Sequence, residues 1–481
     1  MLFNSIEFII FFPVVTLLYF LLPHRFRWLH LLVASCIFYM FFIPVYILIL
    51  AFTIVVDYFA GILIEKAHGK KRKIFLVLSL AANIGVLFAF KYYDFFNENL
   101  VQVARLLSIE YAAHALLIIL PVGLSFHTFQ AMSYTIEVYR GNQKAERHFG
   151  IYALYVMFYP QLVAGPIERP QNLIHQFYER HEFDSNRVSS GLKLMLWGLF
   201  KKIVIADNLA VYVDAVYNQP QAWDGINLIV ATVFFAYQVY CDFSGYSDIA
   251  IGAAEVMGFR LMTNFNRPYQ SKSIAEYWQR WHISLSSWFR DYLYIPLGGS
   301  HGSAASRYFN IFFIFLISGV WHGAGWNFIM WGAINGFYIL FSIWTANLRA
   351  AFVKAVGLIR YPNLHRFIKI VITFSLICYS LMVFRSNSIS DMIYIHRATA
   401  SSIINPFQHI AGLPVSFAQL VLCLAAIVFI EFIDYIQRKR NLRELLAEKP
   451  IWFRWAVYYA FILIIFFAGE FSNRKFFYFQ F

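Results

Sequence analysis

Long uncharged runs of apolar residues recur along the chain, and they constrain its fold more than any other feature. Of the 481 residues, 60% are apolar, 20% are aromatic and only 14% are charged. Roughly 20 apolar residues cross a bilayer as one helix, so this composition supplies at most about 14 spans. Intrinsic disorder is excluded because it requires few aromatic residues and much charge. The composition therefore predicts an all-α, multi-pass membrane protein.

The charge and cysteine content exclude two further classes of protein. The formal net charge of +13 is spread over an apolar chain rather than gathered on a soluble face, so no nucleic-acid partner is expected. None of the four cysteines has the spacing of a metal site or of a disulfide framework, and no metal is predicted. Each lies in an apolar run and is expected to pack as a small buried side chain: Cys36, Cys241, Cys378 and Cys423.

Basic residues between the apolar runs predict how the chain crosses the membrane. The run 6–22 is followed by His24, Arg25 and Arg27, which the positive-inside rule places in the cytoplasm. The run 29–64 is too long for one span, and Pro44 near its middle predicts a turn between two spans. Further apolar runs cover residues 74–90, 115–134, 226–240, 309–344, 368–384, 417–433 and 451–468.

Two other runs do not fit simple spans. Residues 151–164 are too few and end in Gly165-Pro166, which favours a re-entrant segment buried in protein. Residues 188–205 carry Lys193, Lys201 and Lys202, which favours an interfacial or snorkelling helix. We therefore expect roughly ten to twelve spans, with re-entrant and interfacial helices, in a single membrane domain over residues 1–481.

Residues 274–292 combine a helical apolar repeat with a histidine. Apolar side chains recur at steps of three or four, which predicts one amphipathic helix: Ile274, Tyr277, Trp281, Leu285, Trp288 and Tyr292. Glu276 and Arg280 on the opposite face are spaced to pair at i,i+4. His282 lies beside the aromatic stripe. An anchor at the membrane surface explains this pattern as well as a functional site at His282 does.

Residues 312–343 contain no acidic or basic residue apart from His322. Burying an ionisable group in such a run is costly, so His322 is a candidate for a functional site. The alternative is a histidine that only hydrogen-bonds a neighbouring helix. Gly319, Gly323 and Gly325 lie around it, and glycines allow other groups to approach the backbone closely.

Two carboxylates, Asp242 and Asp248, lie beside the apolar run 226–240. They could orient a histidine or bind a cation, but buried charges are usually paired, which favours ion pairs with Arg or Lys. The chain has no G-x-x-x-x-G-K-[ST] motif, so transport driven by ATP is not supported.

The two histidine segments resemble the membrane-bound O-acyltransferase family, and within it the bacterial alginate O-acetyltransferase type. The resemblance rests on FNRPYQSKSIAEYWQRWHISLSSWFRDYLYIPLGG (265–299) and GVWHGAGWNFIMWG (319–332). DFSGYSDIAIG (242–252), LPVGLSFHTFQAMSY (120–134) and YPQLVAGPI (159–167) are similar to further stretches of that type. The likeness extends from Met1 to about Phe384.

The resemblance implies a ring of tilted helices around a central tunnel, with the catalytic motifs between about residues 120 and 345. It maps the catalytic histidine onto His322 and a second motif position onto His282. His322 would act as general base, and His282 would orient or polarise the acyl carbonyl. Residues near these motifs are expected to bind substrate or support the site: Trp278, Trp281, Arg280, Arg290, Asp291, Trp321, Asn327, Asp242 and Asp248.

The resemblance also implies a reaction. The protein would lie in the bacterial cytoplasmic (inner) membrane and take an acetyl group from cytosolic acetyl-coenzyme A, without a permanently bound cofactor. It would pass that group across the bilayer for O-acetylation of an exported polysaccharide of the alginate type. Periplasmic acetyltransferase-type partner proteins would assist.

Several alternatives stay open at this point. The acceptor could be peptidoglycan or cellulose, and the same fold could transfer D-alanyl groups. A transporter or export channel could use the histidine as a gate, and a scaffold of an export complex needs no catalysis. Acyl transfer by the purified protein distinguishes the enzyme from the other two.

Overall fold

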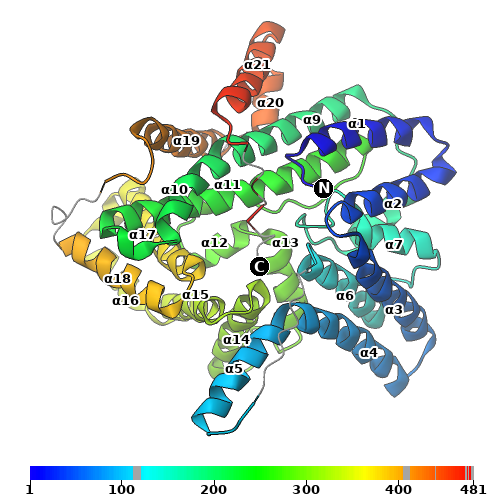
Figure 1. Cartoon of the computed structure of the whole chain (residues 1–481), viewed down its shortest axis with the longest axis horizontal. Coiled ribbons are helices and arrows are strands. Elements are labelled where there is room, and N and C mark those ends of the chain that lie inside the picture. The colour runs from blue at the N-terminus through cyan, green and yellow to red at the C-terminus, as the bar shows by residue number, and fades with distance from the viewer. Residues whose placement is uncertain (112–120, 405–411, 439, 472–473, 475, 478–481) are drawn as a thin grey trace. The chain divides into compact units, whose positions relative to one another are not determined.

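The computed structural model describes residues 1–111, 121–404, 412–438, 440–471, 474, 476 and 477 of the chain. All regular secondary structure in these ranges is helical (Figure 1). The predicted all-α class is therefore confirmed. The chain forms two compact units, of which the first contains residues 1–195 and 246–262 and the second contains residues 196–245 and 263–477. The single domain expected over 1–481 stays a prediction.

Eight helical segments of the described part are long and apolar enough to cross a membrane. They are Pro44–Lys66, Lys70–Leu106, Gly225–Met257, Ala304–His322, Trp326–Trp344, Pro362–Arg385, Phe417–Ile436 and Ile451–Ala468. A ninth apolar helix, Ile6–Leu21, has 16 residues. The protein is thus a multi-pass membrane protein, with fewer such helices than the ten to twelve spans predicted. The run 115–134 lies partly outside the described residues.

The first unit begins with helices that follow the apolar runs. Its helices are α1 (Ile6–Leu21), α2 (His24–Met40), α3 (Ile47–Lys66), α4 (Lys70–Leu87), α5 (Tyr93–Leu106), α6 (Leu124–Arg140), α7 (Phe149–Met157), α8 (Pro170–Leu173) and the first part of α9 (Ser185–Leu199). The turn expected at Pro44 is confirmed as a short 3₁₀ helix, Pro44–Tyr46, between α2 and α3. α7 has nine residues, too few to cross a bilayer, and all but Phe149 are buried.

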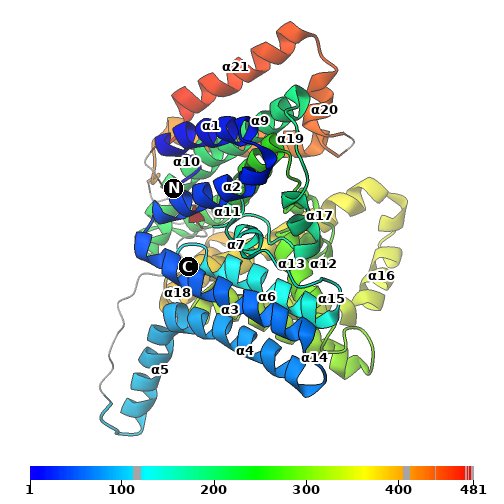
Figure 2. The ribbon, with the colours of Figure 1, turned by 90° about the vertical axis from the view of Figure 1, so that its right-hand side faces the viewer.

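A buried polar cluster joins three helices of this unit, α3, α4 and α6, which lie side by side (Figures 1 and 2). Asp57 on α3 accepts hydrogen bonds from Ser79 (2.6 Å) and Asn83 (2.8 Å) on α4. Ser79 also lies 3.1 Å from the hydroxyl of Thr135 on α6. These bonds satisfy a carboxyl group that would otherwise be costly to bury among apolar helices.

The second unit contains the two histidine segments. It comprises the end of α9, a π-helical turn (Phe200–Ala206), α10 (Asp207–Tyr217), most of α11 (Gly225–Met257), α12 (Ile274–Arg280), α13 (Ile283–Phe289), α14 (Ala304–His322), α15 (Trp326–Trp344), α16 (Ala346–Ala355), α17 (Pro362–Arg385), α18 (Ile389–Ile404), α19 (Phe417–Ile436), α20 (Leu442–Ala447) and α21 (Ile451–Ala468). α21 has the bounds of the predicted run 451–468, and α19 begins where its run begins.

The prediction of a snorkelling helix is wrong for Lys201 and Lys202, because both are buried. Lys202 Nζ lies 2.6 Å from Asp242 on α11 and 2.9 Å from Asp207 on α10. Lys201 donates to the hydroxyl of Ser244, also on α11 (2.8 Å). The paired carboxylates offset the cost of removing the ammonium group of Lys202 from water, so Lys202 stays inside.

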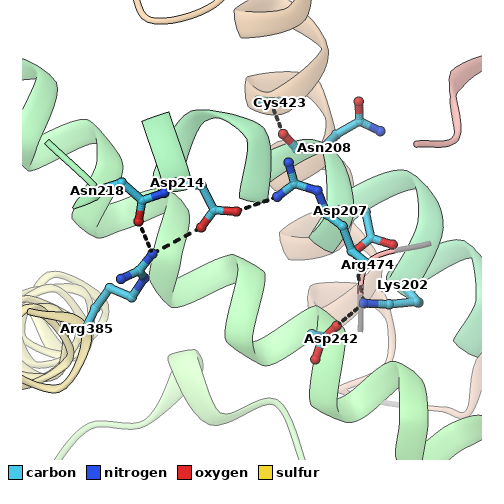
Figure 3. Close-up of polar contacts among 9 residues, drawn as sticks. All are labelled: Lys202, Asp207, Asn208, Asp214, Asn218, Asp242, Arg385, Cys423 and Arg474. Atoms are coloured by element: carbon cyan, nitrogen blue, oxygen red, sulfur yellow. Dashed lines mark hydrogen bonds and ion pairs between the residues drawn. The ribbon is translucent and has the colours of Figure 1, made fainter. Parts of the chain in front are cut away.

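The same helices hold the last described residues of the chain. Asp242 accepts a hydrogen bond from the backbone N–H of Phe477 (2.8 Å). Asp214 on α10 pairs with Arg474 (2.6 Å) and with Arg385 at the end of α17 (3.1 Å), as Figure 3 shows. Two aspartates therefore tie α10 and α11 to α17 and to the C-terminal segment.

Substituting Lys202 by Ala should strongly destabilise the second unit. The change leaves Asp207 and Asp242 buried without their cation, and breaking a buried pair costs about 3–5 kcal/mol. Thermal unfolding of the purified protein in detergent measures the effect. Lys354→Ala, at an exposed position of α16, is the matched control and should change stability by roughly 0.5 kcal/mol or less. Equal effects in the two variants would contradict the structural role of the buried pair.

Candidate active site

A break in the chain at His282 shapes the site. The prediction of one continuous helix over 274–292 is wrong, because α12 ends at Arg280 and α13 begins at Ile283. Trp281 is extended, and His282 has φ 43° and ψ 56°, in the left-handed region. A residue other than glycine pays of order 1–3 kcal/mol for this conformation, which persists only where its surroundings fix it.

Asn264 supplies those surroundings. Its side-chain oxygen accepts hydrogen bonds from the backbone N–H and the hydroxyl of Ser284 (3.3 and 3.0 Å). Its backbone carbonyl accepts from the N–H of Ile283 (2.9 Å), and the N–H of Asn266 donates to the carbonyl of Arg280 (2.9 Å). The segment 264–266 thus replaces the helical bonds that the break removes.

The same contacts define the protonation of His282. Its Nδ1 lies 3.0 Å from the side-chain oxygen of Asn264, which also accepts from a backbone N–H and is therefore the oxygen and not the nitrogen of the amide. A carbonyl oxygen only accepts, so Nδ1 of His282 carries the proton and donates. In the neutral ring this leaves the lone pair on Nε2.

His322 is the last residue of α14, directly before the turn into α15. The two helices pack closely because glycines lie at their contact. A Cβ atom on Gly319 would lie 2.3 Å from the carbonyl oxygen of Phe328, and one on Gly332 would lie 2.4 Å from that of Phe315. The close backbone approach predicted around Gly319 is therefore confirmed. It fixes the end of α14, and with it the position of His322.

Aromatic rings surround His322, which is 6% exposed. Its ring centroid lies 4.9 Å from those of Trp321 and Trp331 and 5.6 Å from that of Phe384. Trp321 also lies near His282, with a centroid distance of 6.4 Å. The two histidines thus share an aromatic neighbour.

His282 and His322 line one cavity of about 240 Å³ in the second unit. Trp278, Trp281 and Arg290 line it as well. The rest of its wall is mainly apolar and includes Leu285, Phe289, Ile311, Ile314, Phe315 and Ile339. Two imidazoles therefore face a small apolar space, with Arg290 as the one cation among the described residues that line it.

Burial depresses the pKa of His282 well below its ordinary value, and the nearby His322 lowers that pKa further. His282 lies outside the helices that are long enough to cross the membrane and is 1% exposed. A neutral imidazole can accept a proton or a hydrogen bond, whereas an imidazolium cannot.

The other residues expected at the site differ in whether they line the cavity. Trp278, Trp281 and Arg290 line the cavity, and Trp321 packs between the two histidines. Asp291 pairs with Arg290 (2.8 Å). The predicted pair of Glu276 and Arg280 is confirmed at 2.7 Å, but Arg280 does not line the cavity of the histidines.

Asn327 and the two aspartates are not among the residues that line the cavity of the histidines. Asn327 donates to the carbonyl of Phe384 (3.1 Å) and so holds one of the rings that pack on His322. Asp242 belongs to the buried ion pair with Lys202, as its sequence context favoured. Asp248 is half-buried in the part of α11 that belongs to the first unit.

Sequence reasoning missed Asn264 and Phe384. Phe384 is 62 positions from His322, and no spacing pattern connects the two. Asn264 lies one residue before the motif that begins at Phe265, and no sequence pattern distinguished it. Among the described residues, no group of three or more His, Cys, Asp or Glu side chains could hold a metal ion.

The fold and the site define a class of protein. It is a multi-pass helical protein in which two buried histidines line one small cavity. The model of the membrane-bound O-acyltransferase (MBOAT) family matches residues 148–385. A probable alginate O-acetylase of Pseudomonas putida is 36% identical over 452 residues, which are 92% of this chain and 89% of that protein. The chain therefore belongs to the membrane-bound O-acyltransferase family.

Two further relatives support membership of this family. A probable alginate O-acetylase of Pseudomonas aeruginosa is 38% identical over 395 residues, 81% of this chain and 73% of its own. A peptidoglycan O-acetyltransferase of Helicobacter pylori is 37% identical over 371 residues, 70% and 69% of the two chains. The protein is thus an enzyme, an O-acyltransferase, and not the transporter or scaffold of the alternatives above.

Removing the side chain of Asn264 should disturb the left-handed turn. Asn264→Ala deletes the acceptor of three contacts around His282, and misplacing a reacting group by about 1 Å can cost on the order of 10²-fold in rate. We expect acyl transfer to fall by about 10- to 100-fold. Asn264→Asp keeps an oxygen acceptor and should retain much of the activity. Equal losses in both variants would contradict the positioning role.

The stability of the protein should also report the depressed pKa of His282. The folded state keeps the ring neutral, whereas the unfolded chain binds a proton below its ordinary pKa of 6.5. Lowering the pH from 7.5 to 5.5 should therefore cost about 1.4 kcal/mol at this residue. The difference in unfolding free energy between the protein and its His282→Asn variant measures this cost. A difference independent of pH would contradict it.

Proposed function

We propose that this O-acyltransferase takes an acetyl group from cytosolic acetyl-coenzyme A and passes it across the membrane for O-acetylation of an exported polysaccharide. One observation carries the proposal: His282 and His322 face the same small cavity, at the break after α12 and at the end of α14. The protein then acts in a bacterial cytoplasmic membrane and needs no bound cofactor, because the donor itself supplies the activated acyl group.

The size of the cavity supports a short acyl group. Pockets for drug-sized ligands hold roughly 300–1,000 Å³. The cavity at the histidines is smaller, about 240 Å³, and is mostly apolar. An acetyl group fits such a space.

His322 acts as the general base in this proposal. It removes the proton from the hydroxyl group of the acceptor as the oxygen of that hydroxyl bonds to the carbonyl carbon of the acetyl thioester. The carbon–sulfur bond then breaks, and the thiolate of coenzyme A takes up the proton. The aromatic rings of Trp321, Trp331 and Phe384 hold the imidazole of His322 and exclude water from this step.

His282 orients the attacking group rather than the acyl carbonyl. Because its Nδ1 donates to Asn264, its Nε2 accepts hydrogen bonds and has no proton with which to polarise a carbonyl. An accepting nitrogen on the wall of the same cavity suits a hydroxyl that approaches His322. This role differs from the one that the family resemblance implied.

The relatives support a polysaccharide acceptor. Two of them carry the name alginate O-acetylase, and the third is named peptidoglycan O-acetyltransferase. We favour an alginate-type polymer over peptidoglycan because the alginate relative of Pseudomonas putida covers more of this chain. A periplasmic acetyltransferase-type partner completes the transfer to the polymer.

Acetyl transfer from labelled acetyl-coenzyme A by the protein in nanodiscs tests the role of His322. General-base catalysis contributes about 10²- to 10⁴-fold, so His322→Ala should lose activity by that factor. His282→Ala should lower kcat as well; an effect on the KM for the donor alone would make His282 a binding residue. His301→Ala, at an exposed loop position, is the control and should keep full activity.

Each outcome separates parts of the proposal. Normal turnover by a folded His322→Ala protein would exclude His322 as the base. If the unaltered protein transfers D-alanyl groups from a carrier protein but no acetyl from acetyl-coenzyme A, the donor is wrong and the site stands.

A further inference from the structure

Three residues of the second unit belong to no motif of the sequence and to no step of the reaction proposed above: Arg474, Phe476 and Phe477. We call them the Phe477 segment. Both phenylalanines are buried, with 1% and 5% of their surface exposed. Buried aromatic side chains contribute much of the packing around them. The neighbours of these two rings therefore show what the segment holds in place.

Polar contacts fix the Phe477 segment to α10 and α11. The carboxylate of Asp214 on α10 pairs with Arg474 at 2.6 Å (Figure 3). Asp242 on α11 accepts a hydrogen bond from the backbone N–H of Phe477 at 2.8 Å. Hydrogen bonds to a charged group are roughly twice as strong as neutral ones. The segment is thus held at the first and at the last of its three residues.

The buried ion pair of the second unit contacts the segment as well. The ammonium group of Lys202, which pairs with Asp242, lies 4.4 Å from the ring centroid of Phe476. This distance is within the range of a cation–π contact, which is stronger where both groups are removed from water. The position of the Phe477 segment therefore depends on the same charges that join α10 and α11.

The ring of Phe477 contacts both α11 and the end of α17. Its centroid lies 5.1 Å from that of Phe235 on α11 and 6.3 Å from that of Phe384 on α17. Phe384 is the ring whose centroid lies 5.6 Å from that of His322. A row of three rings thus leads from Phe477 through Phe384 to the imidazole of His322.

One aspartate holds both sides of the contact between Phe477 and Phe384. Asp214 pairs with Arg474 of the segment and, at 3.1 Å, with Arg385, the residue after Phe384. The carbonyl of Phe384 also accepts a hydrogen bond from the side chain of Asn327 (3.1 Å). These contacts fix the backbone at the end of α17, whereas the ring of Phe384 is held by the aromatic side chains that pack on it.

We propose that Phe477 is a positioning residue for His322 and acts through the ring of Phe384. This inference rests on the proposed function, in which His322 is the general base. Protein interiors are close-packed, so a ring that loses a neighbour shifts or changes its rotamer. A shift of about 1 Å at a reacting group can cost on the order of 10²-fold in rate. Phe477 thereby sets the rate of transfer, although it is not among the residues that line the cavity of the histidines.

Acetyl transfer by a Phe477→Leu variant in nanodiscs tests the proposal. Leucine stays apolar but removes the ring, so kcat should fall about tenfold while the KM for acetyl-coenzyme A stays unchanged. Phe477→Met, with a flexible apolar side chain and no ring, is the second variant and should show the same loss if the leucine variant does not fold.

The matched control is Phe234→Leu. Phe234 on α11 is 1% exposed and packs on the ring of Tyr212 instead, with a centroid distance of 5.0 Å. This variant should lose a similar amount of thermal stability and keep the kcat of the unaltered protein. Equal losses of kcat in Phe234→Leu and Phe477→Leu would show a structural role alone and overturn the proposal.

A double-mutant cycle tests the route through Phe384. If Phe477 acts through this ring, the variant with both Phe384→Leu and Phe477→Leu should have the kcat of Phe384→Leu alone, because the contact is already lost. Losses that multiply would mean that Phe477 acts independently of Phe384, and the proposal would fail.

The same measurements separate this inference from the proposed function. Normal turnover by a folded His322→Ala protein would overturn the role of His322 and, with it, the role of Phe477. Loss of activity in His322→Ala together with an unchanged kcat in Phe477→Leu would overturn the positioning role alone. A higher KM for acetyl-coenzyme A with an unchanged kcat in Phe477→Leu would make Phe477 a determinant of donor binding, which also contradicts the proposal.

Discussion

The left-handed turn at His282 is the constraint on which the rest of the site depends. It ends α12, separates α12 from α13, and places the imidazole of His282 on the wall of the cavity. The turn is unfavourable by itself, and the backbone and side chain of Asn264 hold it. The same amide sets which nitrogen of His282 carries the proton. Asn264 therefore determines both the backbone conformation of His282 and the protonation of its ring.

The second histidine is placed by packing rather than by strain. Glycines at the contact of α14 and α15 allow backbone to meet backbone, which fixes the point where α14 ends in His322. The aromatic rings around His322 then restrict its orientation, and Asn327 holds one of them through the carbonyl of Phe384. The buried ion pair of Lys202 and Asp242 stabilises the same unit. Buried polar groups thus stabilise the fold, as at Lys202 and Asp242, and hold a ring beside His322, as at Asn327.

The sequence predicted what depends on local pattern. Apolar runs gave the position of α21 and the start of α19, and Pro44 marked the turn between α2 and α3. The lone histidine in a charge-free run pointed to His322, and i,i+4 spacing paired Glu276 with Arg280. The features that depend on contacts between distant segments could not be predicted from the sequence. The break at His282 requires Asn264, and the burial of Lys202 requires α11.

The central claim is that His282 and His322 act together at one site of this O-acyltransferase. A double-mutant cycle on acetyl transfer tests it most directly, with His282→Ala, His322→Ala and the double variant. Residues that act as a unit are strongly non-additive, so the double variant should be about as slow as the slower single variant. Losses that multiply, with the double variant slower by the product of the two factors, would mean that the histidines act independently and would contradict the account.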